Sequence, residues 1–327
     1  MKVHSDTNDL PLFKNAAITI GTFDGVHTGH LQIINQLKKE ARKNNGESVI
    51  ITFHPHPRMV IQSSLKDENK PSIKLLNTLP EKIELLCKHE IDHLVIVPFT
   101  KEFSNQSAQE YIRDFLVAKF HPKIIITGYD HRFGKDRKGD YKLLEKYQQE
   151  FNYEVKEIPE HVLRHVTISS TKIRQALIEG DTATANEYLG YDYFFEGEII
   201  EGNKLGRTLG YPTANIYIND TNKLVPAYGV YAVTVSLIIE SQNANDFIAE
   251  ATCKGMMNIG IRPTIGDNKI MIEVNIFNFD KDIYGRTLRV YVKQYMRPEI
   301  KFNGLEELKA QLGIDKIEAE RLLDNSL

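Results

Sequence analysis

Residues 21–30 read GTFDGVHTGH, and they lie between a short apolar run at 16–20 and a helical pattern at 31–43. The glycines of this stretch permit a tight turn and a close approach of the backbone to a ligand. The first turn of the following helix offers free N–H groups and a favourable dipole to a phosphate. His27 and His30 are three residues apart, so both imidazoles can lie on one face of that turn. The stretch therefore predicts a nucleotide-phosphate site between a strand and a helix.

The first half of the chain continues with alternating strands and helices. We expect strands at 48–53, 93–99, 123–127 and 153–158, and helices at 81–89, 108–120 and 141–150. This alternation implies crossover connections and hence a parallel sheet. A last helix begins at the Ser/Thr cluster 169–171, which can cap it. We therefore predict an α/β, Rossmann-like domain over residues 1–189.

The second half of the chain has a different character. Strand patterns joined by turns rich in glycine and proline occur at 194–201, 230–239, 249–257, 271–279 and 287–294. They predict an antiparallel sheet that curls into a barrel. An amphipathic pattern at 305–323 predicts a C-terminal helix. We place this second domain at residues 190–327, and a chain of 327 residues is long enough for two domains.

The composition excludes several classes of protein. Hydrophobic residues make up 41% and charged residues 26% of the chain, which excludes disorder and coiled coil. The net charge of −3 argues against nucleic-acid binding, and the two cysteines form no CxxC pair for zinc. No apolar stretch is long enough to span a bilayer, and no signal peptide is visible. We expect a cytoplasmic protein that takes small-molecule substrates, has no nucleic-acid or membrane partner, and could self-associate transiently.

A second polar motif occupies residues 203–215, which read NKLGRTLGYPTAN. Its glycines and the adjacent Lys204 and Arg207 suit a mobile loop over phosphates. Thr213 and Asn215 offer two oxygens that point the same way on an extended chain, which suits Mg²⁺ shared with a nucleotide. A glycine-rich hairpin with a buried threonine remains the alternative when these residues are considered alone.

Motifs in both halves resemble one family of enzymes. GTFDGVHTGH, with GYDHRFG at 128–134 and SSTKIR at 169–174, is similar to the bacterial FMN adenylyltransferases among the HxGH nucleotidylyltransferases. PTAN at 212–215, with matching segments at 226–231 and 258–264 and a glutamate at 273, resembles riboflavin kinase. Over about residues 15–312, the chain therefore resembles the family of bifunctional riboflavin kinase/FMN adenylyltransferases.

The resemblance implies two reactions and a set of site residues. The second domain would phosphorylate riboflavin to FMN with ATP, and the first would transfer adenylyl from ATP to FMN, giving FAD and pyrophosphate. In the first domain it implies ATP contacts at Gly21, Phe23, Asp24, His27, His30, Asp130, Ser170, Thr171 and Arg174. Flavin contacts are implied at Phe53, Pro57 and Arg297. In the second it implies the base Glu273 and ATP contacts at Lys204, Gly206, Arg207, Thr213 and Asn215, the last two also as Mg²⁺ ligands.

Three positions depart from the family pattern. The family often has an acidic residue at the place of His54, an aromatic residue at the place of His131 and a histidine at the place of Asn275. His54 and His56 alone would suggest a metal site, but no cysteine or acidic partner lies nearby in the sequence. The resemblance places this loop near the flavin instead.

The two reactions require different chemistry. The ribityl hydroxyl is a poor nucleophile at neutral pH and benefits from a base, which is the role implied for Glu273. The phosphate of FMN is already mostly dianionic at pH 7, so it needs positive charge around the α-phosphate of ATP and no base. We expect His27, His30, Arg174 and the helix N-terminus to supply this charge, with the histidines as cations that give the rate an alkaline limb; neutral hydrogen-bond donors are the alternative.

Two other functions are compatible with parts of the sequence. One is a nucleotidylyltransferase for another phosphate monoester, against which the PTAN barrel argues. The other is a flavin-binding regulatory protein without activity, perhaps acting on RNA. The intact set of His27, His30, Thr213, Asn215 and Glu273 argues against that second function.

Overall fold

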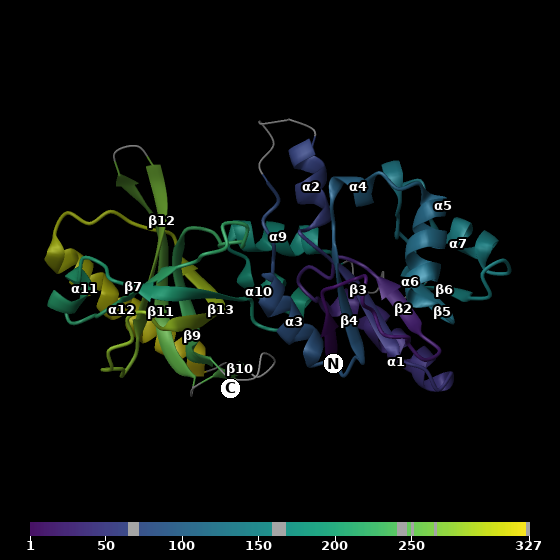
Figure 1. Ribbon diagram of the computed structural model, residues 1–327. Helices are drawn as coiled ribbons and strands as arrows, with labels where there is room; N and C mark the ends of the chain where they lie inside the picture. The colour runs from purple at the N-terminus through teal and green to yellow at the C-terminus, as the bar shows by residue number, and fades with distance from the viewer. Residues whose placement is uncertain (65–71, 159–167, 241–246, 250–251, 265–266, 325–327) are drawn as a thin grey trace. The chain divides into compact units, whose positions relative to one another are not determined.

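The computed structural model describes residues 1–64, 72–158, 168–240, 247–249, 252–264 and 267–324. The chain forms two compact units, Met1–Ser169 and Ser170–Leu327 (Figure 1). The helices α9 (Ser170–Glu179) and α10 (Thr182–Leu189) belong to the second unit. The sequence places them in the first domain, so the division between compact units differs from the predicted domain boundary.

A six-stranded parallel sheet forms the centre of the first unit and confirms the predicted α/β fold. Its strands follow the order β1-β4-β3-β2-β5-β6. They are β1 (Lys2–His4), β2 (Ala17–Ile20), β3 (Ser48–His54), β4 (His93–Pro98), β5 (Ile124–Gly128) and β6 (Glu154–Ile158). Most residues of β2 to β5 are buried on both faces, as expected where helices cover a parallel sheet from both sides. The short strand β1 has no apolar run and was not predicted.

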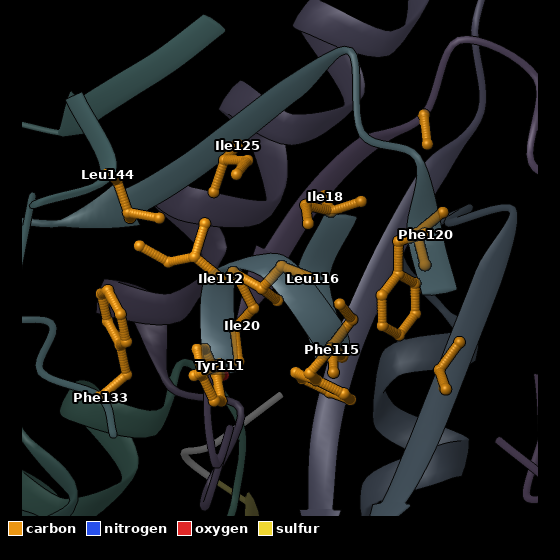
Figure 2. Packing of buried hydrophobic residues seen from close by; sticks show 14 of the residues in the cluster. Ile18, Ile20, Tyr111, Ile112, Phe115, Leu116, Phe120, Ile125, Phe133 and Leu144 are labelled. Carbon is orange, nitrogen blue, oxygen red and sulfur yellow. The ribbon is translucent and has the colours of Figure 1, made fainter. Parts of the chain in front are cut away.

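Helices fill the connections of the first unit. They are α1 (Thr28–Lys43), α2 (Pro57–Ser64), α3 (Leu79–Cys87), α4 (Lys101–Ser104), α5 (Ala108–Glu110), the π-helix η1 (Tyr111–Val117), α6 (Ala118–Phe120), the 3₁₀-helix η2 (Lys135–Arg137) and α7 (Tyr141–Tyr147). The helix predicted at 108–120 is present, but its centre is π-helical. Figure 2 shows Ile112 and Leu116 of this helix packed near Ile18 and Ile125 of the sheet.

The strand order creates a topological switch point between β2 and β5. From β2 the chain proceeds to β3 and β4 on one side, and it later returns to β5 on the other side of β2. The residues that follow β2 and β5 therefore leave neighbouring strands at the carboxyl end of the sheet. Open α/β sheets bind their ligands in the crevice at such a point. Residues 21–30 follow β2 here.

The second unit is built on an antiparallel barrel, as predicted. Its strands are β7 (Phe194–Ile200), β8 (Ala214–Tyr217), β9 (Gly229–Glu240), β11 (Cys253–Thr264), β12 (Asp267–Ile276) and β13 (Thr287–Arg297). They follow the order β9-β11-β12-β8-β7-β13, and pairing of β13 with β9 closes the ring. A short additional strand, β10 (Phe247–Ala249), pairs with β9. Strand β8 was not predicted because only four residues pair.

Helices cover and tie the barrel. In α12 (Leu305–Asp324), Ala319 and Leu323 pack with Ala232, Met256 and Phe277. Helix α10 is bonded to β13, because the Tyr295 N–H donates to Thr182 Oγ1 at 3.1 Å. Between β7 and β8, the predicted glycine loop contains a single helical turn, α11 (Leu205–Thr208).

Candidate active sites

The loop after β2 has an unusual backbone that its surroundings hold in place. Phe23 and Val26 have positive φ angles of 46° and 37°, and Gly25 has one of 88°. Positive φ is costly for residues with a side chain and persists only where the surroundings enforce it. Both side chains are buried, and the Gly21 N–H donates to the Ile51 carbonyl at 3.0 Å. The loop is therefore a rigid element at the switch point.

Two histidines stack at the start of α1. The ring centroids of His27 and His30 are 3.7 Å apart, with an interplanar angle of 15°. His27 caps the helix, since its Nδ1 accepts a hydrogen bond from the His30 N–H at 3.3 Å. The Nδ1 atom of His30 is buried and has no hydrogen-bond partner among the described residues. Both imidazoles therefore lie on one face of the first turn, and one of them keeps a nitrogen for a ligand.

The environment of His30 favours its neutral form. Burial lowers its pKa well below 6.5, and the nearby His27 and Lys82 lower it further. A neutral imidazole can still donate one hydrogen bond from the nitrogen that carries the proton. The structure therefore favours a neutral donor at His30, in place of the cation expected from the sequence.

Asp24 and Lys82 connect the loop to helix α3. The Asp24 carboxylate, only 1% exposed, accepts hydrogen bonds from the backbone N–H groups of Leu76 at 3.0 Å and Asn77 at 3.3 Å. Lys82 Nζ donates to the Thr22 carbonyl oxygen at 2.8 Å. The sequence predicts an ATP contact for Asp24 and does not single out Lys82, which belongs to no motif. Only the packing of α3 against the loop reveals Lys82.

The remaining nucleotide residues predicted in the sequence lie on separate elements. Asp130 is exposed in the turn after β5, at the carboxyl end of the sheet. A Cβ atom on Gly29 would lie 3.8 Å from the carbonyl oxygen of Ile168, two residues before α9 begins. Ser170, Thr171 and Arg174 occupy the first turns of α9 in the second unit. Their contact with the nucleotide stays a prediction.

The second site lies on one face of neighbouring barrel strands. Asn215 of β8 pairs directly with Glu273 of β12. Asn258 of β11 pairs with Glu273 from the other side. Residues that are directly opposite in an antiparallel pair share a face and lie about 4.5–5.5 Å apart at Cβ. Strand register alone therefore places an asparagine on each side of the predicted base.

The segment before β8 packs onto the same residues. A side chain at Gly202 would overlap the Asn215 amide, and one at Gly206 would lie 3.4 Å from Thr213 Oγ1. Thr213 and Asn215 therefore both face this segment. Lys204 of the same segment has Nζ 3.3 Å from a Glu201 carboxylate oxygen and 5.7 Å from the centre of the Tyr284 ring. The backbone of the segment that carries Lys204 and Arg207 thus lies next to Thr213 and Asn215.

The donor set of this face fits Mg²⁺. Asn215 is 6% exposed, and its Oδ1 is buried with no hydrogen-bond partner among the described residues. Mg²⁺ takes few protein ligands and fills its octahedron with water and phosphate oxygens. The described part of the chain contains no cluster of three His, Cys, Asp or Glu residues suited to a metal. Asn275, which departs from the family pattern, donates from Nδ2 to the Pro212 carbonyl at 2.7 Å and so holds the PTAN segment.

Comparisons with known proteins match each half of the chain to one activity. Residues 11–172 match the family model of FAD synthetase, and residues 189–323 match that of riboflavin kinase. A bifunctional riboflavin kinase/FMN adenylyltransferase of Listeria monocytogenes is 37% identical over 314 residues, which is 96% of this chain and 94% of the relative. The Escherichia coli K12 protein of the same description is 34% identical over 306 residues, 94% and 92% of the two chains.

The chain belongs to the bifunctional riboflavin kinase/FMN adenylyltransferase family. It is an enzyme that makes FMN and FAD, and its FAD synthetase part precedes its riboflavin kinase part. A crystal structure from Streptococcus pneumoniae, described as a macrolide-efflux protein, has the same fold, with a TM-score of 0.82 and 29% identity over 98% of both chains. In the described part of this family member, no helix has the length and apolar character needed to cross a membrane.

The predicted flavin residues of the enzyme have other contacts in the structure. Phe53 is buried, and its ring centre lies 5.4 Å from that of Phe99. Pro57 begins α2. The Arg297 guanidinium is bonded to both carboxylate oxygens of Asp315 on α12, at 2.8 and 2.6 Å. Because Asp315 is only 3% exposed, this pair anchors α12 to the end of β13. Flavin contact by these residues stays a prediction.

The other two departures from the family pattern lie at the carboxyl end of the first sheet. His54 is exposed at the end of β3, and the neighbouring His56 accepts the Arg58 N–H at Nδ1, 3.1 Å away. His131 follows β5, and burial lowers its pKa to about 4. Its Nε2 is buried with no hydrogen-bond partner among the described residues. His131 is therefore a neutral ring at neutral pH, as an aromatic residue would be.

Proposed function

We propose that the loop at 21–30 carries out adenylyl transfer and that the face of Thr213, Asn215 and Glu273 carries out riboflavin phosphorylation. The observation that carries this proposal is the direct pairing of Glu273 with Asn215 across β12 and β8. It brings a carboxylate and an unpartnered buried oxygen to one face of the barrel. One group can take a proton there while the other holds a cation.

In the kinase reaction, Glu273 accepts the proton of the ribityl 5′-hydroxyl as that oxygen attacks the γ-phosphorus of ATP. Thr213 and Asn215 would hold Mg²⁺, which neutralises charge on the transferred phosphoryl group when bound. Lys204 and Arg207 lie on the segment that covers these residues, and Gly206 allows this segment to turn tightly against the Tyr211 carbonyl, which an added Cβ would overlap. The base for the ribityl hydroxyl and the groups that position the γ-phosphoryl group therefore lie on the same face of the barrel.

In the adenylyl reaction, a phosphate oxygen of FMN attacks the α-phosphorus of ATP and pyrophosphate leaves. No proton has to be removed from the nucleophile. The N-terminus of α1 and the neutral His30 donate hydrogen bonds to the triphosphate, with His27 holding the turn. We assign Gly21, Phe23, Asp24, Asp130, Ser170, Thr171 and Arg174 to the ATP site, and Phe53 and Pro57 to flavin. Arg297, which lies in the kinase part of the chain, is assigned to flavin there.

By function we assign residues 1–189 to adenylyl transfer and residues 190–327 to the kinase. The motif on α9 supports this division, because it precedes Gly190 and matches the nucleotidylyltransferase pattern. We further propose that the enzyme is cytoplasmic, acts on small molecules and has no nucleic-acid or membrane partner. Transient self-association is compatible with this proposal.

Two variants test the assignment in the intact chain. The His30→Ala enzyme should convert riboflavin to FMN but form little FAD, because loss of one preorganised donor typically slows the catalysed step by about 10²–10³-fold. Glu273→Gln should make little FMN but convert supplied FMN to FAD normally. Flavins are separated after incubation with ATP and Mg²⁺, and Glu198→Gln, an exposed carboxylate on β7, is the control. Loss of both activities in both folded variants would refute the two-site assignment.

A further inference from the structure

Lys82 is a buried cation at the adenylyl site that the scheme above does not use. Its side chain is on α3, and the residue is only 6% exposed. Within the described ranges, its one hydrogen bond is the 2.8 Å bond to the Thr22 carbonyl, and it forms no ion pair within 4.0 Å. An ammonium group has three N–H donors, and a buried charge is costly unless it is paired. Two donors and one positive charge therefore remain for a ligand.

The carboxylates around Lys82 are engaged elsewhere. Asp24 accepts backbone hydrogen bonds from Leu76 and Asn77. On α3 itself, Glu81 accepts the Thr78 N–H at 2.8 Å, and Glu84 accepts a hydrogen bond from Lys88 Nζ at 3.0 Å. The titratable group of α1 that interacts with Lys82 is the imidazole of His30. Within the described structure, no carboxylate lies within 4.0 Å of the Lys82 ammonium group, although Asp24 is close enough to raise the pKa of Lys82.

The same contacts hold the lysine in a fixed position. Lys82 bonds to Thr22 in the loop, while Asp24 of that loop bonds to the residues just before α3. A side chain of the helix thus bonds to the backbone of the loop, and a side chain of the loop bonds to the backbone just before the helix. The Thr52 hydroxyl donates to the same Thr22 oxygen at 3.2 Å and fixes it further. A charge held in this way needs no reorganisation when a phosphate arrives.

We propose that Lys82 supplies the fixed positive charge for the ATP triphosphate in adenylyl transfer. This inference rests on the proposed assignment of the loop at 21–30 to that reaction. Phosphate oxygens take the two remaining N–H donors and pair the charge. As the bond from FMN oxygen to the α-phosphorus forms and the bond to pyrophosphate breaks, negative charge grows on the leaving group. Lys82 stays protonated throughout and stabilises that charge.

The electrostatics of the site agree with this role and predict a pH dependence. Burial lowers the pKa of Lys82 below its ordinary 10.5, and Asp24 acts in the opposite direction. The rate of adenylyl transfer should therefore fall at alkaline pH as the ammonium group loses its proton. An arginine in the same place does not titrate in this range.

The first test is single-turnover FAD formation from FMN between about pH 6 and 10.5. We expect an alkaline fall in the native enzyme, about 10²-fold slower FAD formation in Lys82→Met, and substantial rescue without an alkaline limb in Lys82→Arg. Riboflavin phosphorylation in the same samples monitors folding, and Lys88→Met changes an exposed lysine of the same helix as a control. A native profile that is flat to pH 10.5, or a Lys82→Met rate within twofold of native, would overturn the inference. If Lys82→Met does not fold, the pH profiles of the native enzyme and of Lys82→Arg still test the inference, because only the native profile should fall at alkaline pH.

The second test measures the pKa of His30 by NMR of ¹³C-labelled histidine in the full chain. The pKa of His30 should rise toward 6.5 in Lys82→Met, which loses the positive charge, and stay low in Lys82→Arg, which keeps it. Equal shifts in both variants would mean that Lys82 acts through packing. The site assignment itself is tested separately: native FAD formation by His30→Ala refutes the assignment, whereas loss in His30→Ala with native activity in Lys82→Met refutes only the role of Lys82.

Discussion

The two units of the enzyme carry their proposed chemistry on different parts of their sheets. In the first unit, the site residues lie on loops and helix starts beyond the carboxyl ends of parallel strands. In the second, Asn215 and Glu273 lie within paired strands. The reason is burial: helices cover both faces of the parallel sheet, whereas the barrel strands alternate apolar residues with polar ones. On β12, the buried Ile272 and Val274 flank Glu273 in this way.

The charges of the two sites differ as well, and the nucleophiles explain the difference. A phosphate nucleophile needs no base, and the first site contains a neutral His30 and the buried Lys82. An alcohol nucleophile needs a base, and the second site offers the carboxylate of Glu273 with the neutral oxygens of Thr213 and Asn215. Under the proposed assignment, each site offers the groups that its own reaction requires. The activities should be separable.

The largest expected effect is a complete separation of the activities in fragments. A fragment of residues 170–327 should phosphorylate riboflavin with ATP and Mg²⁺ and form no FAD, because His27, His30 and Lys82 are absent. A shorter fragment of residues 190–327 should show the same product pattern. Flavin separation after long incubation measures both. A folded 170–327 fragment that binds riboflavin and ATP but makes no FMN would show that the barrel is not a self-contained kinase.

The two fragments should nevertheless differ in stability. The shorter one lacks the hydrogen bonds that α9 and α10 make to the barrel. Three of these come from α10: Tyr295 N–H to Thr182, Asn186 Nδ2 to the Val292 carbonyl, and Tyr193 N–H to Asn186 Oδ1, all at 3.1 Å or less. At about 1 kcal/mol each, these three alone should make its free energy of unfolding about 3 kcal/mol lower. Urea titration followed by circular dichroism measures this. Equal stabilities would place the structural boundary at Gly190, where the sequence predicts it.

The fold class of both units was predictable because their periodicities differ so clearly. Alternating strand and helix patterns predict the parallel sheet, and the runs from Phe194 onward predict the barrel. Short elements such as β1 and β8 were missed, because three or four residues carry too little pattern. Strand register was also beyond the sequence, and it is what brings Asn258 and Asn215 to Glu273.

Residues outside any motif were harder to find. Lys82 lies in an ordinary amphipathic helix, and only the packing of α3 reveals its contact with Thr22. Arg297 shows the opposite case. The resemblance implies a flavin contact, while the structure shows its guanidinium bonded to the buried Asp315. Motifs identify residue types at a spacing, but burial and partners follow from contacts between segments that are distant in sequence.

An intermediate effect is expected from Gly202→Ala, which sharpens the comparison by disturbing only the second site. The added methyl group would overlap the side-chain amide of Asn215 and displace it. Misplacement of a site group by about 1 Å can cost on the order of 10²-fold, so riboflavin phosphorylation should slow by about that factor. FAD formation from supplied FMN should not change. Gly304→Ala, where an added Cβ meets nothing within 4 Å, is the matched control. Native kinase rates in Gly202→Ala would mean that Asn215 need not be held in place.

The smallest expected effect is a difference in how the two units respond to acid. All eleven histidines of the chain precede residue 170, so the second unit has no side chain with an ordinary pKa near 6.5. In the first unit, burial lowers the pKa of His131 to about 4 and that of His30 well below 6.5. As the pH falls below 6.5, the unfolded chain binds protons at these histidines that the folded unit does not, so folding becomes less favourable.

His131 alone should cost the first unit about 1 kcal/mol of unfolding free energy between pH 6.5 and 5.5. His131→Phe should remove that part of the pH dependence, because phenylalanine does not titrate. His30, His4 and His89, whose pKa values burial also lowers, should still contribute. The exposed His121 has a left-handed backbone that asparagine tolerates, so His121→Asn is the control for replacement of a histidine in this unit. Calorimetric unfolding of the full chain at several pH values, with the isolated 170–327 fragment to identify the second transition, measures the effect. An identical slope in His131→Phe and the native enzyme would show that His131 is protonated in the folded unit, and its buried Nε2 would then have to donate to a partner.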